Sequence, residues 1–224
     1  MPRQRKLAVY VLPIVLFIGL LLLNSLLKKT GSHFLLSSAE YWIYPFQTIL
    51  CGALVLWFWN DYEFQPLRQV ALTVSVGVIV FLLWISPQQF LGFPARTIGF
   101  NPDIFTGQPG IYWLTVIFRF LRFALVVPFV EEIFWRGFLL RFTIREDFEN
   151  VPLGAFSWLS FAVVTLAFGF SHSRPDWIAA LITGILYNGL IYRTKSLSSC
   201  VLAHAVTNLL LGLWIMTTKQ WGFW

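Results

Sequence analysis

The stretch Glu131-Glu132-Ile133-Phe134-Trp135-Arg136-Gly137 places two adjacent carboxylates and one guanidinium inside a segment that is otherwise apolar. Across residues 111–140 the only other charged side chains are those of Arg119 and Arg122. Charged groups at membrane depth are costly unless they are paired or hydrated, so their presence favours a functional interpretation. A structural ion pair that fixes one helix inside a bundle is the alternative at this point.

A helical conformation would place the two adjacent glutamates on different faces of the helix. Glu132 and Arg136 stand four residues apart, so they can pair on one helix face. Glu131 then points about 100° away from Glu132 and needs a different partner. The stretch therefore predicts one paired carboxylate and one carboxylate that faces other elements of the protein.

The composition is typical of a membrane protein. Of the 224 residues, 58% are hydrophobic and 12% are charged, and the mean hydropathy is +0.72. Soluble domains carry about 25% charged residues. The net charge of +6 forms no basic stripe with aromatic platforms, which argues against nucleic acid as a partner. Cys51 and Cys200 lie in apolar segments and are expected to be buried thiols. The chain is predicted to be an all-α, polytopic transmembrane helix bundle in contact with membrane lipid.

The apolar segments predict about seven membrane spans, within a range of about six to eight. The first segment follows a basic start and is longer than the apolar core of a signal peptide, so it is interpreted as a retained span. A modest excess of Lys and Arg on the same side predicts a cytosolic N-terminus, in a multi-pass protein of the inner or plasma membrane. The predicted spans are residues 7–27, 41–59, 67–85, 111–141, 153–172, 177–192 and 197–216.

The fourth segment, residues 111–141, is longer than the ~20 residues that cross a bilayer. We therefore expect this helix to tilt and protrude, or to kink at Pro128. Counting along the spans also places His204 nearer to the membrane face than Glu131 and His172. A span boundary within residues 173–197 is therefore expected to differ from the ranges above.

The longest polar interval, residues 86–110, contains four prolines and four glycines. Such a composition favours turns and extended segments over a helix. It predicts a boundary between an N-terminal membrane part, residues 1–110, and a motif-bearing membrane domain, residues 111–224. A long loop can also be an ordered cover over a site, and this alternative stays open.

Few other polar side chains in the apolar segments are suited to catalysis. Of the three histidines, His33 lies in a polar loop and is expected only to be solvated, whereas His172 ends one apolar segment and His204 lies inside the last. His204 and Asn208 stand four residues apart, so they share a helix face and can act on a common point. Asn188 is expected to make a hydrogen bond between helices.

These residue types are suited to hydrolysis by an activated water. A carboxylate in a low-dielectric pocket can serve as a general base, and imidazoles can hold the water or donate a proton. An amide can donate a hydrogen bond to an oxyanion. One carboxylate and two imidazoles also make an acceptable zinc site, with Glu131, His172 and His204 as the candidate ligands. Neither the His-Glu-x-x-His pattern of zincins nor the Gly-x-Ser-x-Gly pattern of serine hydrolases is present.

Three ordered motifs resemble those of one known family. Glu131-Glu132-x-x-x-Arg136, Phe168-x-x-x-His172 and His204-x-x-x-Asn208 each lie on a separate apolar segment. They resemble the motifs of the CAAX-protease and bacteriocin-processing (CPBP/Abi) family of intramembrane endopeptidases. The resemblance covers roughly residues 111–216, and the first three spans carry no matching motif.

The resemblance implies an endopeptidase that cleaves a membrane-associated protein or peptide. By the resemblance, Glu131 would activate water together with His172, while His204 and Asn208 would stabilise the oxyanion. Glu132 and Arg136 would support the site. Metal-dependent and metal-free mechanisms are both compatible with these residues, so a zinc cofactor is left open.

Two other classes of function are compatible with the same residues. A transporter or channel can line a proton or ion path with intramembrane charges, although no inverted repeat or pair of broken helices is evident. A non-catalytic immunity or scaffold protein can keep the motifs for structural reasons. Arg119 and Arg122 could receive a substrate carboxylate. The simpler alternative, which we expect, is that their guanidinium groups extend (snorkel) toward the membrane interface.

Overall fold

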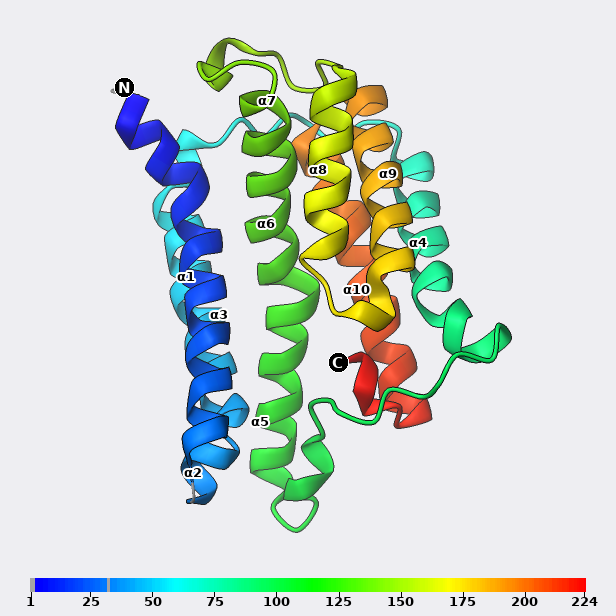
Figure 1. Ribbon diagram of the computed structural model, residues 1–224. Helices are drawn as coiled ribbons and strands as arrows, with labels where there is room; N and C mark the ends of the chain where they lie inside the picture. The colour runs from blue at the N-terminus through cyan, green and yellow to red at the C-terminus, as the bar shows by residue number, and fades with distance from the viewer. Residues whose placement is uncertain (1–2, 32) are drawn as a thin grey trace.

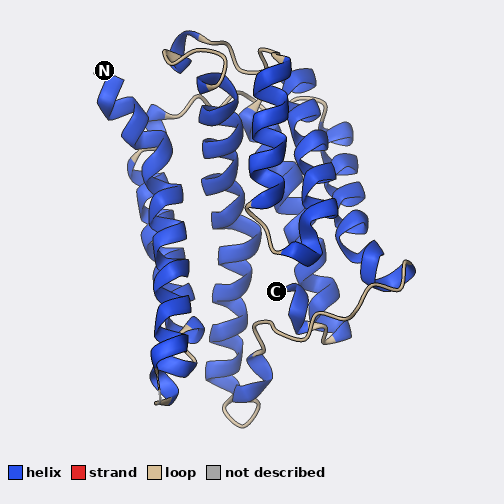
Figure 2. Ribbon diagram, in the orientation of Figure 1, coloured by secondary structure: helices blue, strands red, loops and turns tan. Residues whose placement is uncertain are grey.

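A computed structural model describes residues 3–31 and 33–224, and within these ranges every regular element is a helix (Figure 2). The predicted all-α fold is therefore confirmed. Met1 and Pro2, at the end predicted to be cytosolic, lie outside the described residues. The eight helices in these ranges are α1 (Arg3–Thr30), α2 (Phe34–Ser37), α3 (Glu40–Trp57), α4 (Val70–Phe90), a continuous helix that contains α5 (Pro109–Phe120), α6 (Val127–Glu132) and α7 (Leu140–Phe142), α8 (Trp158–Phe170), α9 (Trp177–Thr194) and α10 (Leu197–Thr218).

Four helices are long and apolar enough to cross a membrane, and they cover Arg5–Thr30, Val70–Phe90, Pro109–Phe142 and Leu197–Thr218. Large apolar side chains lie exposed on the bundle, such as Leu26 at 60% and Trp57 at 82%, which suits contact with lipid. The chain is therefore a multi-pass integral membrane protein. α3 and α9 run alongside the long helices in Figure 1, whereas α8 has only 13 residues. The number of about seven spans and the cytosolic N-terminus stay predictions.

The motif-bearing segment forms one continuous helix, Pro109–Phe142, which we call the central helix (green in Figure 1). It continues through Pro128 because its turns widen: Leu121–Val126 and Ile133–Leu139 are π-helical. Proline has no backbone N–H to donate, so one carbonyl in the turn before it lacks its backbone partner. In a π-helical turn this is the carbonyl five residues earlier, and not the carbonyl four residues earlier. π-helical turns inside α-helices are frequent at functional sites, and here they flank the two glutamates.

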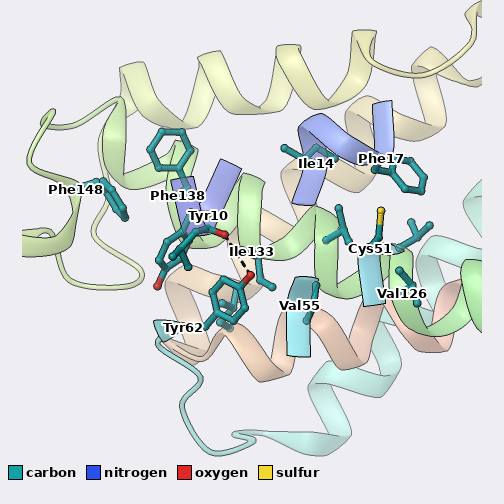
Figure 3. Close-up of a cluster of buried hydrophobic side chains, with 14 of the residues drawn as sticks. Tyr10, Ile14, Phe17, Cys51, Val55, Tyr62, Val126, Ile133, Phe138 and Phe148 are labelled. Atoms are coloured by element: carbon teal, nitrogen blue, oxygen red, sulfur yellow. Dashed lines mark hydrogen bonds between the residues drawn. The ribbon is translucent and has the colours of Figure 1, made fainter. Parts of the chain in front are cut away.

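α1 and α3 pack on one face of the central helix through a shared hydrophobic core (Figure 3). The N-terminal helices therefore support the helix that carries the glutamates. The division of the chain into two parts at residue 110 stays a prediction. Cys51 lies in this core and is fully buried, as predicted. The core includes Tyr10, Ile14 and Phe17 from α1, Val55 from α3, and Val126, Ile133 and Phe138 from the central helix.

α4, α8, α9 and α10 form a second core with another face of the central helix. The backbones of α4 and α10 come close at Gly77, where an added Cβ would lie 2.6 Å from the carbonyl oxygen of Ala203. The Thr207 hydroxyl donates to the Gly77 carbonyl at 2.8 Å. α4 thus holds in place the helix that carries His204. Cys200 is fully buried in this core, also as predicted.

The helix ends differ from the predicted span boundaries at several places. Within residues 173–197 one predicted boundary differs slightly: α9 ends at Thr194 and not at residue 192, whereas α9 begins at Trp177 and α10 at Leu197, as their predicted spans do. Larger differences lie earlier in the chain: α4 continues to Phe90 and does not end at residue 85, and α8 begins at Trp158 and not at residue 153. Gly154, with a φ of +75°, keeps the chain in a turn before α8.

Candidate active site

A cavity of about 170 Å³ lies between the central helix, α4, α8, α9 and α10. The four residues predicted to be catalytic, Glu131, His172, His204 and Asn208, all line it. They come from three separate elements that the fold brings together. The remaining wall is mostly apolar or aromatic and includes Val80, Trp84, Phe123, Val127, Phe168, Leu211 and Phe223.

The two adjacent glutamates have different surroundings. Glu131 is partly exposed and lines the cavity, whereas Glu132 is fully buried behind it. The predicted contact of Glu132 with Arg136 is present, with NH1 of the guanidinium 3.1 Å from Oε1 of the carboxylate. Neither side chain of this pair has exposed surface. The structure thus places one carboxylate in an ion pair and leaves the other facing the cavity.

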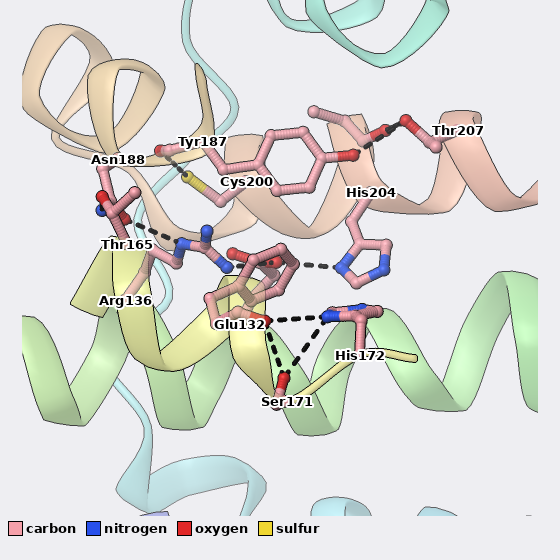
Figure 4. A network of polar contacts seen from close by, with 12 residues as sticks. Glu132, Arg136, Thr165, Ser171, His172, Tyr187, Asn188, Cys200, His204 and Thr207 are labelled. Atoms are coloured by element: carbon pink, nitrogen blue, oxygen red, sulfur yellow. Dashed lines mark hydrogen bonds and ion pairs between the residues drawn. The ribbon is translucent and has the colours of Figure 1, made fainter. Parts of the chain in front are cut away.

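The partner of His204 is Glu132, which sequence reasoning did not foresee (Figure 4). Nδ1 of His204 lies 2.9 Å from Oε1 of Glu132, the same oxygen that accepts from Arg136. A carboxylate paired with a guanidinium accepts hydrogen bonds, so Nδ1 of His204 carries the hydrogen. In the neutral ring Nε2 is then the unprotonated nitrogen, and His204 presents it among the groups that line the cavity.

Arg136 is held from several sides. Its Nε donates to Oδ1 of Asn188 at 3.2 Å, and the amide of Asn188 donates to Oγ1 of Thr165 at 3.1 Å. The predicted role of Asn188 in a hydrogen bond between helices is confirmed. The guanidinium also lies over the ring of Phe168, 4.7 Å from its centroid. This network fixes Glu132 and, through it, the ring of His204.

His172 is the residue that follows the end of α8 by two positions, and its ring is oriented by local contacts. Nδ1 lies 2.8 Å from the carbonyl oxygen of Phe168, which can only accept, so Nδ1 is the donor. The ring also lies between aromatic groups, 4.8 Å from the ring of Phe168 and 5.4 Å from that of Trp84. Nε2 of the neutral ring is again left unprotonated.

Asn208 has a structural partner inside the cavity wall. Its amide nitrogen donates to the carbonyl oxygen of Phe123 at 2.7 Å. In the π-helical segment the amide of Val127 bonds to the carbonyl of Arg122, five residues earlier. The same spacing would give Phe123 the amide of residue 128, but Pro128 has none. Asn208 therefore satisfies a carbonyl that proline leaves without its backbone partner, and keeps one further N–H for another acceptor.

Three further polar residues that the sequence did not single out line the cavity, namely Thr183, Tyr187 and Thr207. The hydroxyls of Tyr187 and Thr207 lie 2.8 Å apart and join α9 to α10. Tyr187 directly precedes Asn188, and Thr207 follows His204 by three positions. Their position in the sequence, next to Asn188 and one helical turn after His204, is the signal that could have identified Tyr187 and Thr207.

The sequence left open a zinc ion held by Glu131, His172 and His204, and all three side chains line the cavity. Within residues 3–31 and 33–224, no three side chains of His, Cys, Asp or Glu come together closely enough to hold a metal ion. The imidazole of His204 is turned with Nδ1 toward Glu132, which is not one of the three candidate ligands.

Arg119 and Arg122 do not snorkel toward the membrane interface, since only 5% and 6% of their surfaces are exposed. The Arg119 guanidinium lies 5.0 Å from the ring centroids of Tyr44 and Phe100. Nε of Arg122 donates to the side chain of Gln47 at 2.5 Å. The aromatic rings and Gln47 thus surround the two buried cations, although Nε and NH1 of Arg119 have no hydrogen-bond partner among the described residues. Binding of a substrate carboxylate by either side chain stays a prediction.

Comparison with known proteins gives a family match. The family model described as type II CAAX prenyl endopeptidase Rce1-like matches residues 111–210. No curated protein and no solved structure matches the chain. The matched residues contain all four cavity-lining candidates together with Glu132 and Arg136.

Proposed function

Residues 111–210 form a domain of the Rce1-like type II CAAX prenyl endopeptidase family, which makes the chain a peptidase, and from this premise we propose that it is an intramembrane endopeptidase. Its substrate in this proposal is a peptide bond of a membrane-associated protein or peptide. The observation that carries the proposal is the convergence of Glu131, His172, His204 and Asn208 on one cavity inside the bundle.

In the proposed reaction Glu131 is the general base. Its carboxylate takes a proton from a water molecule, and the water oxygen attacks the carbonyl carbon of the peptide bond. The unprotonated Nε2 of His172 accepts a hydrogen bond from the other O–H of that water and so orients it, while this hydrogen stays on the water oxygen. The attack produces a tetrahedral intermediate with one negatively charged oxygen.

His204 and Asn208 stabilise the oxyanion. The second amide N–H of Asn208 can donate to it, since only one is shown bound to the Phe123 carbonyl. A protonated His204 donates from Nε2, and the Glu132 carboxylate beside Nδ1 balances the charge of the ring. When the intermediate collapses, the C–N bond breaks and the proton held by Glu131 passes to the leaving amine.

The apolar wall of the cavity favours this chemistry. Electrostatic interactions between the reacting groups are stronger where bulk water is excluded. Phe168 and Trp84 also hold the ring of His172 in place, so little reorganisation is needed during the reaction.

A comparison of protein C-termini in cells tests the proposal. Membrane fractions from cells with the intact protein and with Glu131→Gln are compared by mass spectrometry of C-terminal peptides. We expect truncated C-termini that are present only with the intact protein. Identical sets of C-termini, at equal amounts of folded protein, would contradict the proposal. A pH-dependent ion flux lost in the same variant would favour a transporter instead.

A further inference from the structure

Arg96 lies in the Pro- and Gly-rich interval, outside the residues that match the family model. Within residues 91–100 only Arg96 and Phe100 turn inward, and the other side chains of this loop are exposed. The Arg96 side chain is only 10% exposed. A long cation in an otherwise exposed loop has ample access to water, so its burial calls for a specific partner.

That partner is Asp176. Two nitrogens of the Arg96 guanidinium donate to Oδ1 of Asp176, Nε at 3.1 Å and NH2 at 2.5 Å. The Asp176 side chain is 15% exposed, so the pair is largely shielded from water. Charge-assisted hydrogen bonds in such surroundings are stronger than those of exposed ion pairs.

Asp176 in turn fixes the segment that carries His172. Oδ2 of its carboxylate accepts the hydroxyl of Ser173 at 2.5 Å, and its backbone amide donates to the Ser173 carbonyl at 2.9 Å. The next residue, Trp177, donates its indole N–H to the carbonyl of His172 at 3.0 Å. The turn of residues 171–176 is thus tied together, and Arg96 reaches it through the Asp176 carboxylate.

Besides Asp176, Arg96 contacts Phe223 in the wall of the cavity. Its guanidinium lies over the ring of Phe223, 3.9 Å from the centroid, and Phe223 lines the cavity. Its backbone amide donates to the side chain of Gln88 at 3.0 Å. The Arg96 carbonyl is so close to Gly222 that a Cβ added there would clash with its oxygen. Arg96 therefore packs between α4 and the segment that follows α10.

We propose that Arg96 is a positioning residue for His172. It joins the turn after α8 to the wall that contains Phe223, and so holds the imidazole of His172 at the cavity. The inference rests on the proposed function, because His172 is the residue whose position is argued to matter. It also makes the loop after α4 part of the active site, although the family match does not reach it.

Chemical labelling of the histidines tests the position of the ring independently of catalysis. Purified protein in nanodiscs is treated with diethyl pyrocarbonate, which modifies unprotonated imidazole nitrogens, and the rate at each histidine is read by mass spectrometry. His33 is exposed and serves as the internal reference. In Arg96→Ala we expect labelling of His172 to rise by about threefold or more relative to His33, because its turn opens locally. His204 should keep its wild-type rate.

Kinetics with a defined probe give the second readout. Hydrolysis of a farnesylated CAAX peptide should show a fall in kcat of about tenfold or more in Arg96→Ala, because a displaced catalytic group loses orientation. KM should stay within about twofold of wild type, since Arg96 does not line the cavity. Arg96→Lys, which can still reach Asp176, should recover part of kcat.

The exchange variant Arg96→Asp with Asp176→Arg should restore the wild-type labelling ratio. Lys28→Gln, which breaks the Lys28–Glu40 ion pair far from the turn, is the matched control and should change neither readout.

Unchanged labelling of His172 in Arg96→Ala would overturn the inference. An equal rise at His172 and His204, with a lower melting temperature, would also overturn it, because it would show general loosening. If the wild-type protein cleaves no peptide, the proposed function fails, and the labelling ratio alone still decides whether Arg96 positions His172.

Discussion

Nδ1 of His204 lies 2.9 Å from Oε1 of Glu132, an oxygen that also accepts a hydrogen bond from Arg136. This contact joins the first and third motifs across two helices. It gives Glu132 a wider role than an ion pair within its own helix, because it orients an imidazole at the cavity. Only Glu131 of the two adjacent carboxylates is left to face a substrate.

Removal of the Glu132 charge should destabilise the bundle strongly. In Glu132→Leu the buried guanidinium of Arg136 loses its counter-charge, which costs about 3–5 kcal/mol. The measurement is the free energy of unfolding in mixed detergent micelles. Glu132→Leu combined with Arg136→Met removes both charges and should recover most of the loss. A single variant as stable as wild type would show that the pair is not what anchors the helix.

Asn208 should contribute to stability through the carbonyl of Phe123. Asn208→Ala leaves that buried carbonyl without its partner, at a cost of about 1–3 kcal/mol. Pro128→Ala in the same background supplies a backbone N–H at residue 128 and should recover part of this stability. The two variants and their combination form a double-mutant cycle in the unfolding free energy. Strictly additive effects would argue against the link between Pro128 and Asn208.

The same cycle separates the two roles of Asn208. If Asn208 also donates to the oxyanion, Pro128→Ala should restore stability to Asn208→Ala without restoring peptide hydrolysis. Recovery of both together would assign Asn208 a structural role alone.

Close packing at Gly77 should be needed for the position of α10. In Gly77→Ala the added Cβ meets the Ala203 carbonyl and the side chain of Val206, so the helices must separate, at about 1–3 kcal/mol. Gly189, in the interior of α9, has nothing within 4 Å of an added Cβ. Gly189→Ala is therefore the control and should be neutral or stabilising, by up to about 1 kcal/mol. Thermal unfolding of both variants checks the difference, and equal effects would contradict it.

Local patterns in the sequence predicted contacts within and next to the central helix. The spacing of Glu132 and Arg136 gave their ion pair, because residues four apart share a helix face. Asn188 was expected to bond between helices, since a buried amide in an apolar segment needs a partner. Both expectations depend on short-range geometry or on the cost of an unsatisfied polar group.

Contacts between distant segments could not be predicted in the same way. Nothing in the spacing of residues shows that His204 contacts Glu132 and not Glu131, because this depends on how α10 packs against the central helix. The π-helical turns around Pro128 also depend on packing, since proline alone is compatible with a kink. The contact of Arg96 with Asp176 crosses from the loop to the start of α9. Of the two interpretations of residues 86–110, the ordered cover agrees with this contact.

The central claim is that Glu131 activates water for peptide hydrolysis. Its direct test is the rate of cleavage of a farnesylated CAAX peptide by purified protein in nanodiscs, for wild type, Glu131→Gln and the control Glu149→Gln. Glu149 contacts Lys6 in a loop outside the cavity. The three proteins are first compared by circular dichroism and melting temperature, so that only equally folded samples enter the assay.

We expect Glu131→Gln to lower kcat by about 10²–10⁴-fold, the usual contribution of a general base, while Glu149→Gln cleaves at the wild-type rate. Cleavage at the wild-type rate by an equally folded Glu131→Gln would contradict the role of Glu131 as the general base.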